Sequence, residues 1–207
     1  MAGTVKAYVI MSAVIVGAAA VLGAVNKLID LDWLNDFLSE AFPTISVIML
    51  ATCSIVVVLG VFNTNNPEGG GYKYYHSLPN SAVHFQNAVF FANVLTAVMT
   101  AAYMAVAAVF FGAETALFAA GVSLFSVGLM NFLGYTKSPL SKMIPLFIAG
   151  CMAGAFASGF AAGFADGAEI EVSLRVFVVI GAAALAVYLA SAVYAVLKAR
   201  IAWGREI

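Results

Sequence analysis

The stretch NTNNPEGGGYKYYHSLPNSAVHFQN, residues 63–87, is a polar island between two long apolar runs, 43–62 and 86–111. The chain around it is 64% hydrophobic and only 9% charged, whereas about a quarter of the residues of an average soluble domain are charged. Each apolar run has the roughly 20 residues that a helix needs to cross a bilayer. The sequence therefore predicts an integral membrane protein built from helices.

Apolar length and turn signals divide the chain into six such runs, which we interpret as one transmembrane domain covering residues 1–207. The expected spans are 7–26, 43–62, 86–111, 115–135, 140–165 and 172–197. The first run is longer than the apolar core of a secretory signal, so we interpret it as a retained helix. The predicted fold class is an all-α, polytopic membrane protein.

Basic residues gather on one side of this arrangement, and Lys and Arg are enriched in cytoplasmic loops. Lys27 and Arg175 fall on the outer side, together with most of the acidic residues. With the amino terminus inside, seven of the nine basic residues face the cytoplasm: Lys6, Lys73, Lys137, Lys142, Lys198, Arg200 and Arg205. This sorting predicts that both termini and the polar island are cytoplasmic.

A second segment outside the spans, residues 27–42, has a helical pattern of its own. Its apolar side chains recur at helical spacing opposite acidic and amide side chains: Leu28, Leu31, Leu34, Leu38 and Phe42. The pattern predicts a short amphipathic helix at the outer interface after the first span. An extension of the first span is the alternative.

The predicted spans have no central Asp, Glu, Lys, Arg or His, which are the groups that proton-coupled carriers use inside a membrane. His76 and His84 lie in the island without a nearby Cys or carboxylate cluster, and Gly69 to Gly71 lacks the Lys that follows in a phosphate-binding loop. We interpret Cys53 and Cys151 as buried thiols. We expect no catalytic, metal or cofactor site in this chain and no nucleic-acid partner.

Small and uncharged polar residues are placed where helices could pack or where cargo could pass. In the fifth span, small residues recur every four positions and favour close helix contact, within the chain or with a second copy: Gly150, Gly154, Gly159 and Gly163. Polar side chains in the third and fourth spans could line a pathway or cross-brace the bundle: Asn93, Thr96, Thr100, Ser123 and Asn131.

The island itself predicts a helix-break-helix segment. Gly69 to Gly71 interrupts any helix, and Asn80 or Ser81 after Pro79 can cap a new helix that continues into the third span. Tyrosines crowd the middle of the island, and Tyr is enriched both at membrane interfaces and at protein contacts. We favour docking to a soluble partner over anchoring in the interface.

Residues 68–81, which we call the elbow, resemble a segment of the membrane subunit of ABC-2 type ABC transporters. In that family a stretch of the form E…G…SLP-x-S forms a cytoplasmic coupling helix that sits in a groove of the ATPase subunit. The resemblance covers the six-span layout, with specific residues only in the elbow. It implies that the ATPase-contacting residues are Glu68, Tyr72, Lys73, Tyr74, Tyr75, His76, Leu78, Pro79 and Ser81.

The resemblance further implies a half-transporter of a prokaryotic inner membrane. It would work beside a second copy or a homologous permease, and separate ATPase subunits would bind ATP and Mg. The expected function is ATP-driven export of a peptide, lipid-linked or other amphipathic substrate, with no enzymatic activity in this chain itself. The alternative is a membrane scaffold that recruits a soluble partner through residues 63–87 without transport.

Overall fold

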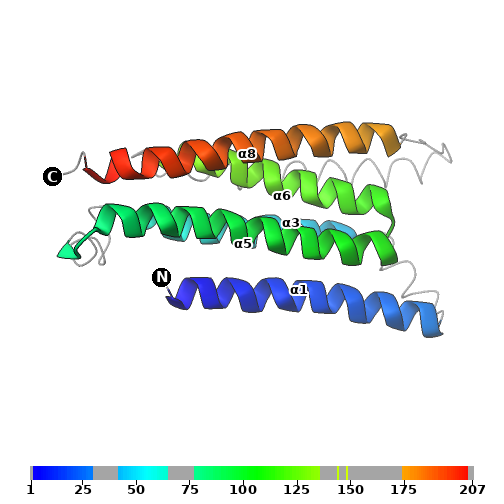
Figure 1. Cartoon of the computed structure of the whole chain (residues 1–207). Helices are drawn as coiled ribbons and strands as arrows, with labels where there is room; N and C mark the ends of the chain where they lie inside the picture. Colours follow the sequence, from blue (N-terminus) through cyan, green and yellow to red (C-terminus); the bar gives the residue numbers. More distant parts are fainter. Residues whose placement is uncertain are drawn as a thin grey trace.

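The structure is a computed structural model that describes residues 2–29, 42–64, 77–135, 144, 148 and 174–204. Within these residues the regular elements are all helices, and their axes lie roughly parallel to one another (Figure 1). They are α1 (Ala2–Ile29), α3 (Phe42–Asn63), α5 (Ser81–Phe110), α6 (Ala113–Leu133) and α8 (Leu174–Gly204). The described part of the chain is therefore an all-α bundle.

Three of these helices, α5, α6 and α8, are long and apolar enough to cross a membrane. Even α6, with 21 residues, reaches about 31 Å at 1.5 Å per residue, which matches a hydrocarbon core of about 30 Å. Helices α1 and α3 contain shorter apolar stretches, 13–29 and 48–63. The chain is a membrane-embedded helical protein, and the full set of six spans stays a prediction.

Some expected elements lie outside the described residues. They are the fifth span, 140–165, apart from Ile144 and Ile148, and the outer amphipathic segment from Asp30 to Ala41. The glycines expected to pack in the fifth span lie outside them too: Gly150, Gly154, Gly159 and Gly163.

Helix α6 is the most buried of these three long apolar helices. About 67% of its apolar stretch is buried, against 33% for α5 and 22% for α8. Small residues let α8 come close to it. A Cβ atom at Gly128 would lie 3.3 Å from Val187 Cγ1 and 3.5 Å from the Cα atom of Tyr188. Membrane helices associate through such small-residue faces because lipid provides no hydrophobic drive between them.

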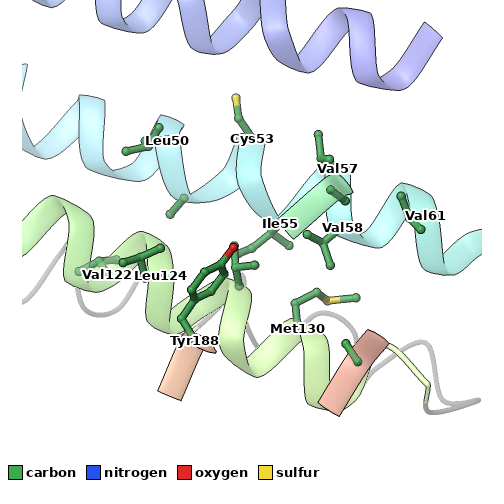
Figure 2. Close-up of a cluster of buried hydrophobic side chains, with 14 of the residues drawn as sticks. Leu50, Cys53, Ile55, Val57, Val58, Val61, Val122, Leu124, Met130 and Tyr188 are labelled. Carbon is green, nitrogen blue, oxygen red and sulfur yellow. The ribbon is translucent and has the colours of Figure 1, made fainter. Parts of the chain in front are cut away.

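Helix α3 is buried on two sides, between α1 and α6 (Figure 2). Cys53 and Val57 point toward α1, whereas Ile55 and Val58 point toward α6, and all four are buried. A helix with neighbours on both sides is expected to be apolar all round, as this one is. The free thiol of Cys53 is part of this core, as predicted, and Cys151 lies outside the described residues.

The outward faces of α5 and α8 carry large exposed apolar side chains. They include Phe91, Val98, Val179, Leu189, Val193 and Leu197. A soluble monomer rarely exposes so extended an apolar surface, whereas lipid tails cover it at no cost. These faces are suited to contact lipid.

Three helices extend beyond the spans that apolar length predicts by five residues or more. Helix α1 begins at Ala2 and not at 7, and the other two are α5 and α8. Helix α5 begins at Ser81 and not at 86, and α8 continues to Gly204 and not to 197. The added turns contain polar and basic residues, such as His84 and Lys198. Such residues end an apolar run in the sequence, but a helix can continue through them into the headgroup region. The extensions of α5 and α8 meet at the same end of the bundle.

Candidate functional site

The elbow is described only over its last part, residues 77–81, which lead into α5. Pro79 is exposed and Leu78 is half-buried. The carbonyl of Leu78 accepts a hydrogen bond from the Ser81 N–H at 3.2 Å, so the chain turns directly in front of the helix. The other predicted ATPase-contacting residues lie outside the described residues: Glu68, Tyr72, Lys73, Tyr74, Tyr75 and His76.

Asn80, one of the two residues predicted to cap α5, occupies the N-cap position, but its side chain makes no capping hydrogen bond. Its backbone is left-handed, with φ 58°, a conformation that Asn tolerates better than most residues. The Asn80 carbonyl accepts from the N–H groups of Val83 and His84 at 2.9 and 3.1 Å. The turn that ends the elbow is thus a sharp change of direction, one residue long.

The first turns of α5 are bound to the last turns of α8. Trp203 donates its indole N–H to the Ser81 hydroxyl at 2.8 Å, and its ring stacks on Phe85 with the centroids 4.7 Å apart. Gln86 donates from Nε2 to the Val196 carbonyl at 3.2 Å. We call these five residues the α5–α8 junction. Ser81, predicted to contact an ATPase, thus makes its observed hydrogen bond within the chain.

Aromatic rings fill the same end of the bundle between α3, α6 and α8. The Phe62 and Tyr135 rings meet edge to face, with centroids 4.8 Å apart, and the Tyr135 hydroxyl donates to the Ala195 carbonyl. The Lys198 ammonium lies 5.4 Å from the Tyr135 ring centre and 4.9 Å from that of Tyr194. Tyrosines and a lysine at one helix end are typical of a membrane–water interface.

A buried polar network joins α5, α6 and α8. Asn131 donates to Asn93 Oδ1 at 2.7 Å, Asn93 donates back to Asn131 Oδ1 at 3.3 Å, and Asn131 also donates to the Ser191 hydroxyl at 3.3 Å. Ser191 donates to the Tyr188 carbonyl at 2.8 Å, and the Tyr188 hydroxyl donates to the Asn93 carbonyl at 2.5 Å. All four side chains are at most 4% exposed.

Hydroxyl groups continue this polar region toward α3. The Ser123 hydroxyl lies 3.4 Å from that of Thr100 and donates to the Ser54 hydroxyl at 3.5 Å. Thr96 donates to the carbonyl of Ala92 within its own helix at 3.0 Å. All of the predicted pathway or packing residues of α5 and α6 are therefore buried and hydrogen-bonded within the chain.

The comparisons with known proteins add no identification. No protein-family model, curated protein or solved structure matches the chain.

The chemistry of the site therefore follows from its own residues. The buried network is built from neutral amides and hydroxyls, which donate and accept hydrogen bonds. Within the described residues, no group of three or more His, Cys, Asp or Glu side chains could hold a metal ion. The arrangement braces helices against one another and holds two distant segments of the chain together.

Several residues of the site are missing from the expectations drawn from sequence. Ser54, Tyr188, Ser191 and Trp203 lie in apolar or terminal stretches, where a single polar atom changes no pattern. Ser191 and Tyr188 are three residues apart and so share one face of α8, which is the signal that periodicity offers. No local signal links Trp203 to Ser81, because the two are 122 positions apart.

Proposed function

We propose that the chain is the transmembrane subunit of an ATP-driven ABC exporter and that a separate ATPase subunit docks on the elbow. The observation that carries the proposal is the direct path from the elbow into the bundle. Residues 78–81 pass into α5 within one turn, and the α5–α8 junction binds the start of that helix to α8. A surface segment attached in this way is suited to receive movement.

Rigid attachment matters because a flexible linker would absorb a displacement before it reached the helices. From the junction inward, α5 is joined to α6 and α8 by the Asn93–Asn131 pair and by the Tyr188 hydroxyl. A displacement of the elbow would therefore reach three helices. This property fits a coupling element better than a loop that only anchors the protein in the interface.

The distribution of charge also supports an external energy source. His84 and Glu114 lie in the first turns of their helices, and Arg175 is the second residue of α8. Charged groups midway through a span are the usual sign of proton or ion coupling, and α5 and α6 carry none there. In the proposal, ATP and Mg bind to the partner subunit, and a second copy or homologous permease completes the pathway.

The cargo proposed is a peptide, a lipid-linked molecule or another amphipathic compound. The buried polar groups of α5 and α6 are neutral and are surrounded by apolar side chains, so contact with them would not require an ionic cargo. Their hydrogen bonds are made within the chain, which favours bracing as their role in this conformation. The pathway itself would then run along another surface or open in another conformation.

The test replaces the half-buried elbow residue Leu78 by Asp and measures co-purification with a candidate ATPase subunit, together with stimulation of ATP hydrolysis. A triple variant with Tyr74, Tyr75 and Leu78 all changed to Asp strengthens the effect. Asn63→Asp is the matched control. Asn63 is the exposed last residue of α3, outside the elbow, and its replacement adds the same negative charge. We expect the elbow variants to lose association with the ATPase and the control to retain it.

Undiminished association and stimulation in the elbow variants would refute the docking site. Reconstitution into vesicles then separates the two classes of function. ATP-dependent movement of cargo is expected for an exporter subunit, whereas a bound partner without such movement would favour the scaffold.

A further inference from the structure

Trp203 is the residue that brings α8 to the elbow. Its side chain is 3% exposed, and its ring lies nearly parallel to that of Phe85, at 25°. Its one hydrogen-bond donor points at Ser81, the first residue of α5. A buried indole N–H needs an acceptor, so the ring and the hydroxyl together fix one position of Trp203 relative to the start of α5.

Within the described residues, the start of α5 is held mainly by contacts with α8. Asn80 provides no side-chain cap, and the backbone there makes a left-handed turn. The first residues of α5 after this turn are held by α8, initially through Trp203 and one turn later through the Gln86 bond to the Val196 carbonyl. The elbow therefore ends in a tight turn, and the helix that begins there is attached to a second helix.

We propose that Trp203 is a positioning residue that delivers the movement of the elbow to α8 together with α5. The inference rests on the proposed function, because the movement would come from the ATPase subunit. With the indole in place, a displacement of Ser81 shifts both helices as one unit. Without it, the first turn of α5 can shift relative to α8, and part of the work of ATP hydrolysis is lost before it reaches α8.

The first test measures transported cargo per ATP hydrolysed in the reconstituted complex. Trp203→Phe retains an aromatic ring but removes the donor, and Ser81→Ala removes the acceptor while keeping the indole. We expect Trp203→Phe, which lies outside the elbow, to co-purify with the ATPase and hydrolyse ATP, with several-fold less cargo moved per ATP. Because Ser81 belongs to the elbow, Ser81→Ala is judged only by the cargo moved per ATP hydrolysed, which should fall by a similar factor. The double variant is expected to be no worse than either single one, since both remove the same bond.

The second test uses Trp203 as its own reporter. The chain has two tryptophans, Trp33 and Trp203, so Trp33→Phe leaves Trp203 as the only indole of this chain, and the emission of the ATPase subunit alone is subtracted. We expect the emission of this variant to shift when the ATPase subunit and a non-hydrolysable ATP analogue are added. The shift should disappear when Ser81→Ala is added, and Trp33→Phe alone should transport as the unmodified protein does.

The outcomes separate the inference from the function beneath it. If the ATPase subunit binds and cargo moves, but Trp203→Phe and Ser81→Ala retain full transport per ATP and the emission does not shift, the inference is wrong and the proposed function stands. If the unmodified chain neither binds nor stimulates the ATPase, the proposed function fails, and the inference fails with it.

Discussion

The side chains of Asn93 and Asn131 exchange two hydrogen bonds between α5 and α6, at 2.7 and 3.3 Å, in the buried centre of the bundle. Each amide thus satisfies a donor and an acceptor of the other, and Ser191 accepts a further bond from Asn131. Unpaired amides are costly in hydrocarbon, so this pair favours one arrangement of the helices over others that bury the same apolar area.

We expect the Asn93 and Asn131 side chains to be energetically coupled. Asn93→Ala and Asn131→Ala should each lower the free energy of unfolding in mixed micelles, since each leaves the other amide without its partner. The double variant should cost less than the two single costs added together, by about 0.6 to 1.7 kcal/mol, the range found for polar pairs in membrane proteins. Additive costs would contradict a direct interaction.

Gly134 is expected to tolerate no larger side chain, because a Cβ atom there would overlap the ring of Phe62. Gly134→Ala should destabilise the protein by about 1 to 3 kcal/mol, the usual cost of overpacking. When Phe62→Leu is combined with Gly134→Ala, part of this loss should be restored, because the smaller Leu side chain leaves space for the added Cβ atom. Gly17→Ala is the control, since nothing lies within 4 Å of its added Cβ, and thermal inactivation in detergent measures all three.

The close approach of α6 and α8 predicts a second intolerant glycine. Gly128→Leu should weaken the contact between these helices, because even a Cβ there meets Val187 at 3.3 Å and Ser191 Oγ at 3.4 Å. We expect a loss of about 1 to 3 kcal/mol in the free energy of unfolding. Gly181→Ala on the facing helix meets Leu117 at an ordinary 3.7 Å and should have little effect. Equal costs at both positions would contradict this explanation.

The charge-based orientation predicts opposite accessibility at the two ends of the bundle. Single cysteines at the exposed positions Asn63 and Glu114, with Cys53 and Cys151 replaced by Ala, mark these ends. In intact cells a membrane-impermeant maleimide should label Glu114→Cys and spare Asn63→Cys until the membrane is opened. Labelling in the reverse pattern would place the elbow outside the cell and contradict docking to a cytoplasmic ATPase.

Sequence reasoning predicted the helical class and the approximate positions of the five described helices from apolar length. It located α3 within one residue at each end, because this helix is apolar nearly from its first residue to its last. It ended α8 early at 197, because Lys198 and Arg200 lower the local hydrophobicity although the helix continues through them. The length of an apolar run indicates where the hydrocarbon core of the membrane ends, and a helix can continue beyond that point.

The candidate site could be predicted only in part for a related reason. Asn93 and Asn131 are conspicuous in apolar spans, so composition alone singles them out. Their pairing, however, depends on the rotation of α5 and α6 about their axes, which is set by the packing of many small side chains. The role of Trp203 has no signal in the local sequence, because its partner Ser81 is 122 positions away along the chain.

The separation of Ser81 and Trp203 has a consequence for biosynthesis. The 122 positions between them take on the order of ten seconds to translate at the usual rate of about 5–20 residues per second. During that interval α5 is already made, but the helix that secures its first turn does not yet exist. A nascent chain therefore offers an elbow without its support, and a partner that recognises the supported form would bind finished subunits in preference to partly synthesised ones.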